Sequence, residues 1–106
     1  MTTSSETPVL DTLAAMTLDS VERCGLPMDQ LILTRIAALV AMDAPPMSYL
    51  AHIGPAMESG VTAAQVQDVL VAIAPIVGTA HVMSAAGHIA EGLGFAIAVA
   101  ESELDA

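Results

Sequence analysis

The chain has 106 residues, which allows one domain and leaves no room for a second hydrophobic core. Its twelve acidic residues against two arginines give a formal charge of −10, which excludes binding to nucleic acid and to anionic membrane surfaces. Apolar residues make up 55% of the chain even without glycine, against roughly 45 to 50% with glycine in ordinary soluble domains. Since a lone domain of this size hides only about two-thirds of its surface, we expect an acidic protein that forms a homo-oligomer.

The first predicted helix has Thr7 as its N-cap and Pro8 in its first helical position, and it ends before Gly25 and Pro27. Because Cys24 is the only cysteine and lies on the apolar face, the sequence predicts a buried structural thiol and no cysteine-based metal site. Helical spacing places six residues on this face: Leu10, Leu13, Ala14, Thr17, Val21 and Cys24.

The second predicted helix covers residues 28–42. It has to end there because Pro45 disfavours the helical conformation at Ala44. Its apolar residues recur with the spacing of one helix face: Met28, Leu31, Ile32, Ile36, Leu39 and Val40.

The third predicted helix is capped by Asp43. Pro45 and Pro46 then occupy early helical positions, where a missing amide hydrogen is harmless. We expect this helix to continue to about Ser59, with a kink or interruption at Pro55.

The strongest local signal in the chain is Gly60 followed by Thr62 and Gln65, a helix-ending glycine and then a capping box. The sequence therefore predicts a tight joint and a fourth helix that begins next to Thr62. Gly78 ends this helix, with Pro75 in its last turn. One apolar stripe runs along it: Val66, Val69, Leu70, Ile73 and Val77.

The fifth predicted helix begins near Thr79 and extends at most to Glu103. Residues 101–106 are expected to fray because acidic side chains oppose the helix dipole there. Its apolar face lies opposite a second face with His81, Ser84, His88, Glu91 and Phe95. Gly87, Gly92 and Gly94 each lower the stability of a helix by roughly 1 kcal/mol relative to alanine. We therefore expect another backbone to approach this helix closely, at a contact between subunits.

Neither the start of the chain nor its longest uncharged stretch has the pattern of a targeting or membrane segment. Residues 1–8 have neither the positive nor the apolar region of a signal peptide, and we expect residues 1–6 to be flexible. The longest uncharged stretch, residues 69–90, is long enough to cross a bilayer, but prolines, glycines and histidines interrupt it and basic flanks are missing. We expect a cytoplasmic protein without a membrane partner.

Three segments carry a resemblance to a known family: LTRIAALVAM at 33–42, SYLAHIGPAMESG at 48–60 and VTAAQVQDVLVAIAPIVG at 61–78. From about Asp29 to Phe95, the order of these helices resembles the carboxymuconolactone decarboxylase and alkylhydroperoxidase D-like superfamily. The resemblance implies an all-α, five-helix subunit, one domain over residues 1–106, that forms trimers or hexamers with active sites near subunit contacts.

The chain resembles the branch of that family that lacks the Cys-x-x-Cys motif. In the redox branch, two cysteines three apart precede a histidine by four residues, and the matching positions here are Pro45, Ser48 and His52. Neither proline nor an unactivated serine supplies a thiolate. The glutamate that relays protons in that branch also has no counterpart in residues 33–35. We therefore expect no thiol peroxidase activity.

The decarboxylase branch is thought to use acid and base residues around a lactone carboxylate, so we interpret His52 as the candidate acid or base. Ser48 lies one turn before it, and Tyr49 can donate to a substrate oxygen. Arg35 is the better of two cations for binding a carboxylate. An active enzyme would then be a decarboxylase-like lyase. The alternative is that His52 and Tyr49 serve only packing.

His81 and His88 lie about 10.5 Å apart along a helix, too far to hold one ion within one chain. His88 and Glu91 share a face, so a symmetry axis could assemble a metal site between subunits. A solvated or interface polar stripe is the simpler interpretation, and we expect neither a metal nor a cofactor.

Two functions remain open. In the first, the chain binds or acts on a small lactone or carboxylic acid in a pocket between the second, third and fifth helices, with His52 inside. In the second, it is a non-catalytic oligomeric scaffold or protein-interaction subunit in which Pro45, Pro46 and Met47 fill the ancestral site. The first requires an open pocket and the second requires a filled one.

Overall fold

The computed structural model describes residues 6–53 and 60–93, and these residues form α-helices without any strand. The five-helix, all-α fold predicted from the sequence is therefore confirmed. Among the described residues, no helix is both long and apolar enough to cross a bilayer. The helices are α1 (Pro8–Arg23), α2 (Met28–Ala41), α3 (Pro46–Ile53), α4 (Ala63–Val77) and α5 (Thr79–Leu93).

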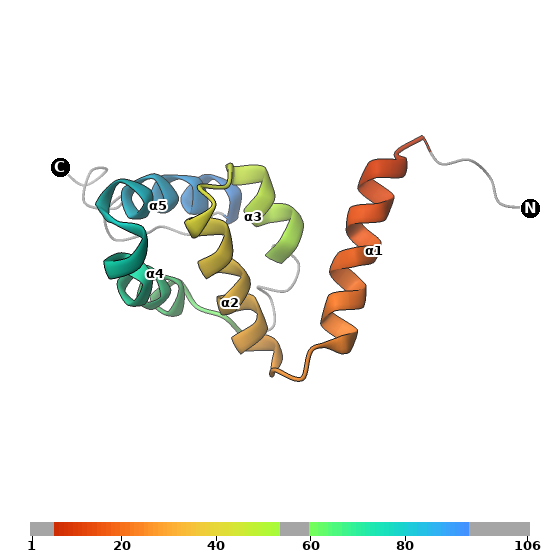
Figure 1. The fold of residues 1–106 in the computed structure, drawn as a ribbon, viewed down its shortest axis with the longest axis horizontal. Helices are drawn as coiled ribbons and strands as arrows, with labels where there is room; N and C mark the ends of the chain where they lie inside the picture. Colours follow the sequence, from red (N-terminus) through yellow and green to blue (C-terminus); the bar gives the residue numbers. More distant parts are fainter. Residues whose placement is uncertain (1–5, 54–59, 94–106) are drawn as a thin grey trace, which may run out of the picture.

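The hydrophobic core lies between α2, α3, α4 and α5, which form a bundle, while α1 stands to one side (Figure 1). α2 packs mainly against α4, and α3 packs mainly against α5. The predicted stripes of α2 and α4 point into this core, apart from Met28, which is 41% exposed. The largest side chains with no exposed surface are Tyr49, Ile32, Ile36, Ile89, Val40 and Val66.

The predicted joint before α4 is confirmed in detail. Thr62 Oγ1 accepts a hydrogen bond from the amide of Gln65 at 3.1 Å, and Gln65 Oε1 accepts one from the amide of Thr62 at 3.0 Å. Gly60 and Gly78 both adopt positive φ, at 117° and 87°, in the turns before and after the helix. These turns favour glycine because a Cβ atom makes that backbone conformation costly.

The prediction that Asp43 caps the third helix is wrong, because α3 begins only at Pro46. Asp43 instead sits in a turn with a φ of 52°, and its carboxylate accepts a hydrogen bond from Ser84 Oγ at 2.9 Å. His88 Nδ1 lies 2.9 Å from the carbonyl oxygen of Ala44, which can only accept. The polar face of α5 thus holds the turn between α2 and α3.

The close backbone approach predicted at the glycines of α5 exists at Gly92, but it occurs within the chain. A Cβ atom on Gly92 would overlap the carbonyl oxygen of Pro46, at the start of α3. Gly87, by contrast, faces open space. The expected subunit contact is therefore not needed to explain Gly92, and Gly94 lies outside the described residues.

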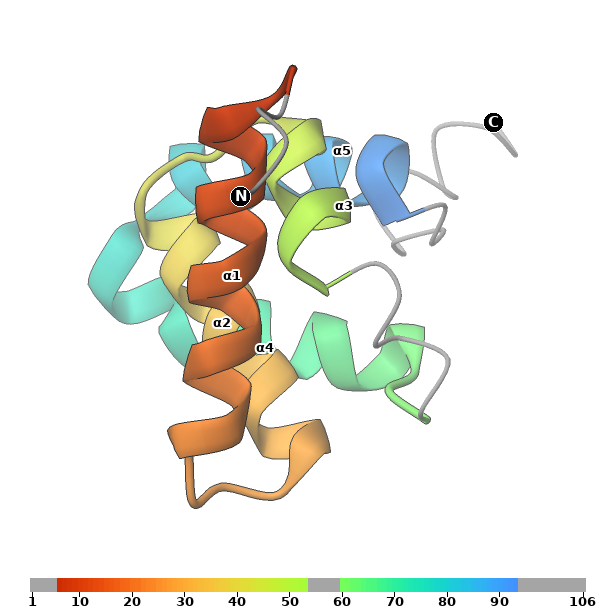
Figure 2. The same cartoon turned by 90° about the vertical axis from the view of Figure 1, so that its right-hand side faces the viewer.

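α1 buries none of its residues, although its sequence is amphipathic. Leu10 and Leu13 of its predicted apolar face are 64% and 46% exposed, and only its C-terminal end, at Val21 and Cys24, packs against the core. Figure 2 shows α1 in front of α2, along one side of the bundle. Cys24 is half-buried rather than buried, and its sulfur accepts a hydrogen bond from the amide of Leu26 at 3.4 Å.

Some sequence predictions fall on residues that the structure does not describe. These are the flexible start of the chain up to residue 5, the interruption at Pro55, the helix beyond Leu93 with Phe95, and the frayed tail at 101–106. They remain predictions.

Candidate functional site

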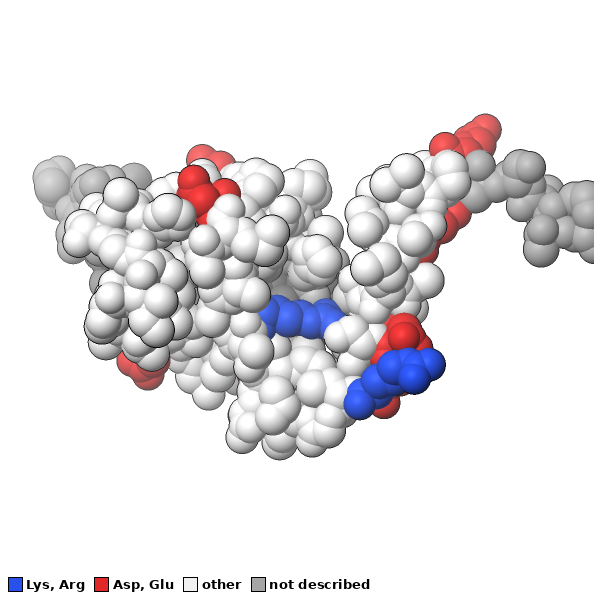
Figure 3. All heavy atoms as spheres, in the orientation of Figure 1, with Lys and Arg blue, Asp and Glu red and all other residues white. Residues whose placement is uncertain are grey.

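A groove separates α1 from the bundle, and Arg35 of α2 crosses it. Figure 3 shows the hollow between α1 and the bundle, with basic atoms inside it. The guanidinium group donates to the backbone carbonyl of Thr17 in α1 at 3.1 Å and to that of His52 in α3 at 3.4 Å. Arg35 therefore links three helices. The groove contains two hollows, the first and the second chamber, and Thr17, Arg35 and His52 line both of them.

The first chamber has a volume of about 530 Å³ and contains three of the four candidate site residues. Arg35 comes from α2, while Ser48 and His52 come from α3, where a spacing of four residues puts them on one helix face. Thr17 and Ser20 of α1 and Asp43 of the turn supply its other polar groups. The structure therefore places three of the residues predicted from the sequence, Arg35, Ser48 and His52, in one chamber.

The predicted position of this site, between the second, third and fifth helices, is wrong. The third wall is α1 and not α5, because α3 turns its Tyr49 face into the core against α5 and its Ser48 and His52 face outward. Sequence reasoning missed Thr17 and Ser20, since no local pattern shows that α1 folds back beside α3. The turn residue Asp43 was missed as well, because its cap role was assumed.

Ser48 and His52 share the first chamber without a hydrogen bond to each other. His52 is exposed and Ser48 is half-buried. A serine nucleophile needs a base within hydrogen-bond reach and a third group that orients the base. The geometry therefore supports acid–base use of His52 better than nucleophilic use of Ser48.

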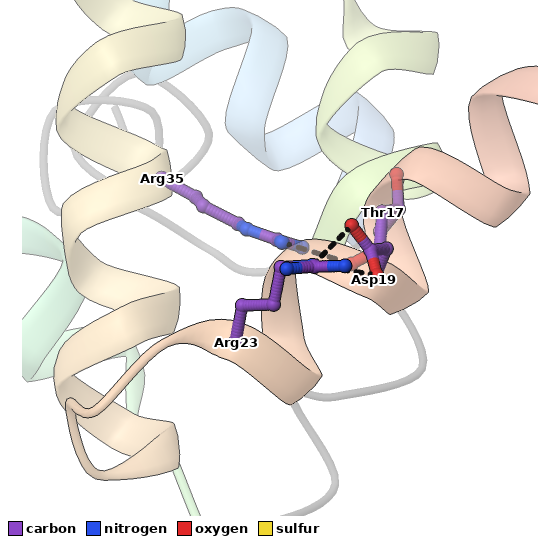
Figure 4. Close-up of polar contacts among 4 residues, drawn as sticks. All are labelled: Thr17, Asp19, Arg23 and Arg35. Carbon is purple, nitrogen blue, oxygen red and sulfur yellow. Dashed lines mark hydrogen bonds and ion pairs between the residues drawn. The ribbon is translucent and has the colours of Figure 1, made fainter.

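Arg35 is the cation of the site. The other cation, Arg23, forms an exposed ion pair with Asp19 at 2.9 Å, whereas Arg35 forms no ion pair within residues 6–53 and 60–93 (Figure 4). A guanidinium group has five N–H donors, and the two carbonyl contacts leave others for a ligand. Planar donors of this kind match a carboxylate with two hydrogen bonds.

Tyr49 lies away from both chambers, with no exposed surface. Its hydroxyl has no hydrogen-bond partner within the part of the chain that the structure describes. Burial raises the pKa of this hydroxyl from 10.0 to about 12, and the negative charge of Asp43 adds to the shift. Tyr49 therefore lies beneath the site, and the described geometry gives it no direct contact with a ligand in the groove.

Alkaline titration of Tyr49 tests this placement directly, because the chain has a single tyrosine and no tryptophan. We expect the absorbance of the phenolate to rise with a midpoint near pH 12 in the folded protein and near pH 10 after unfolding. Since the raised pKa favours the neutral hydroxyl in the folded state, the free energy of unfolding should fall as the pH rises from 10 towards 12. Tyr49→Phe should lack this fall, and a folded-state midpoint near pH 10 would contradict the buried position.

The two residues of α5 that could contribute to a metal site, His88 and Glu91, differ in exposure. His88 is half-buried and uses Nδ1 for the carbonyl of Ala44, while Glu91 is exposed. The described ranges contain no group of three or more histidine, cysteine or acidic side chains that could hold an ion. A site shared between subunits stays an untested prediction.

Comparison with known protein families gives a match that covers most of the chain. The model of the carboxymuconolactone decarboxylase family matches residues 8–91, a range that includes α1, the groove and most of α5. No curated protein and no solved structure matches the chain significantly.

Proposed function

Because the chain belongs to the carboxymuconolactone decarboxylase family, we propose that it binds and acts on a small lactone or carboxylic acid in the first chamber. The observation that carries this proposal is the convergence of Arg35, Ser48 and His52 on one open chamber of about 530 Å³. That volume lies in the range of about 300 to 1,000 Å³ that is usual for small-molecule sites.

Arg35 binds the ligand carboxylate in this proposal. Its unused N–H donors are available in the groove, whereas Arg23, the other cation of the chain, is paired with Asp19 and lines neither chamber. Ser48 offers a hydroxyl that can donate to or accept from a second ligand oxygen. The ligand is thereby held with its reactive carbon near His52.

His52 acts as the general acid or base. In its acid form the imidazole can deliver a proton to the ligand carbon from which CO₂ leaves, and in its base form it can accept a proton from the ligand. The reaction class is decarboxylase-like lyase chemistry. Thiol peroxidase chemistry has no thiol pair in this site, because the motif positions are Pro45 and Ser48.

The alternative of a non-catalytic scaffold has one supporting observation, the exposed apolar surface of α1. We propose that this surface packs against other copies of the chain, in a trimer or hexamer, which is compatible with either function. The prolines and methionine that would fill an ancestral site do not close the first chamber: Met47 is 68% exposed and Pro45 only lines the chamber. This favours the ligand-binding proposal.

Small lactones and carboxylic acids, screened against the wild type and His52→Ala, test the proposal. A ligand that binds only the folded state raises the melting temperature, and the rise grows with the logarithm of the ligand concentration above its Kd. We expect His52→Ala to bind the same ligand within a factor of about three and to lose turnover by about 100-fold or more, because general acid–base catalysis contributes about 10² to 10⁴.

His81→Ala serves as the control, since His81 lines neither chamber. If no member of the screen stabilises the wild type, the binding proposal fails. If His52→Ala turns over as fast as the wild type, His52 has no catalytic role.

A further inference from the structure

The second chamber of the groove, with a volume of about 460 Å³, differs in chemistry from the first. Apart from Thr17, Arg35 and His52, which both chambers share, its lining is apolar. Leu18 and Val21 come from α1, Leu31 and Ile32 from α2, and Ala51 from α3. A chamber with this lining accepts hydrocarbon, and its polar groups come only from Thr17, Arg35 and His52, with Arg35 bonded to the other two through their backbone carbonyls.

The charges around Arg35 are also unequal on its two sides. Asp43 lines the first chamber, whereas no acidic residue of the described chain lines the second. In a protein with a net charge of −10, an anion that approaches Arg35 through the second chamber therefore passes no carboxylate among the described residues that line it. The positive charge and the apolar volume are complementary to the two ends of an amphiphilic acid.

We infer that the ligand is an amphiphilic monocarboxylic acid, whose carboxylate binds Arg35 and whose hydrocarbon tail occupies the second chamber. This inference rests on the proposed function, because it takes from it the carboxylate at Arg35. It adds the substrate class: the tail selects the ligand by its apolar length. An apolar segment of a second copy of the chain would fill the same volume but would leave the guanidinium without an anionic partner.

Calorimetry measures how affinity depends on the length of the tail. Straight-chain carboxylates from butanoate to decanoate are titrated into the wild type, each below its micelle concentration. We expect affinity to rise about threefold to fourfold for each added methylene until the second chamber is full. Primary alcohols of the same lengths should bind at least about tenfold more weakly, because they lack the charge that pairs with Arg35.

Two variants address the chamber itself. Ala51→Phe reduces its volume and Leu18→Asn makes its lining polar, and both residues are exposed enough for the fold to tolerate the change. Both variants should bind butanoate much as the wild type does and lose the gain with chain length. Ala38→Phe, which narrows the first chamber instead, should keep the length dependence of the wild type.

The outcomes separate this inference from the function on which it rests. If butanoate binds but longer acids bind no better, or if Ala51→Phe and Leu18→Asn keep the full length dependence, the inference is overturned and the proposed function stands. If no carboxylate binds the wild type at any length, the proposed function fails first. If the two variants lower the mass of the oligomer and leave the length dependence intact, a second copy occupies the chamber and the inference is wrong.

Discussion

Replacing Arg35 by methionine is expected to weaken the binding of a small carboxylate by roughly 10- to 100-fold. Hydrogen bonds to charged groups contribute about 1.5 to 3 kcal/mol, and methionine keeps an unbranched apolar stem while removing the charge and all N–H donors. Calorimetric titration with butanoate measures the loss. The affinity of Arg35→Lys for butanoate should lie between those of the wild type and Arg35→Met, because lysine keeps the charge without the planar donors.

The matched control for this prediction is Arg23→Met, which removes the only other cation of the chain. Arg23 pairs with Asp19 in an exposed i, i+4 contact, with 80% and 58% of the two side chains accessible. Exposed pairs of this kind contribute little to stability. Arg23→Met should therefore bind butanoate as the wild type does. Equal losses in the two variants would show that the anion responds to net charge alone and not to the Arg35 site.

Gly92→Ala is expected to lower the free energy of unfolding by about 1 to 3 kcal/mol, the usual cost of forcing an extra methyl group into a packed contact. The new Cβ atom meets the backbone carbonyl of Pro46, which cannot rotate away as a side chain would. Alanine otherwise favours a helix over glycine, so the sign of the change depends on this contact. Chemical denaturation of the two proteins measures it.

Gly87→Ala, five residues earlier in α5, is the control for helix propensity. Gly87 faces open space, so alanine should raise the free energy of unfolding by up to about 1 kcal/mol. Opposite signs for the two substitutions are the expected result. A gain in both would show that α3 does not approach α5 at Pro46 as closely as the structure has it.

The helices could be predicted from the sequence where their ends depend on local chemistry. Thr62 and Gln65 bond each other across three residues, and Gly60 and Gly78 end their segments through backbone conformations that glycine favours. Pro8 occupies the first turn of α1 as predicted. Such signals need no knowledge of the rest of the fold.

The errors concern contacts between segments far apart in the chain. Asp43 has the chemistry of an N-cap, but Ser84 of α5, forty-one residues later, takes its carboxylate. Gly92 correctly indicates that another backbone segment approaches α5 closely. Only the packing of α3 on α5 shows that this segment is Pro46. The sequence also predicts α5, and not α1, as the third wall of the pocket. No residue spacing within α1 indicates that Thr17 lies opposite His52.

The two walls of the groove are held very differently. The turn that borders the first chamber is fixed to α5 through Asp43 and Ala44, and the α2 and α3 wall belongs to the core. α1 buries no residue and meets Arg35 through a single carbonyl. If the groove widens or narrows for ligands of different thickness, α1 is therefore the wall that moves with the least loss of buried contacts. Substitutions on its exposed half should change the width of the groove with little effect on the packing of the bundle.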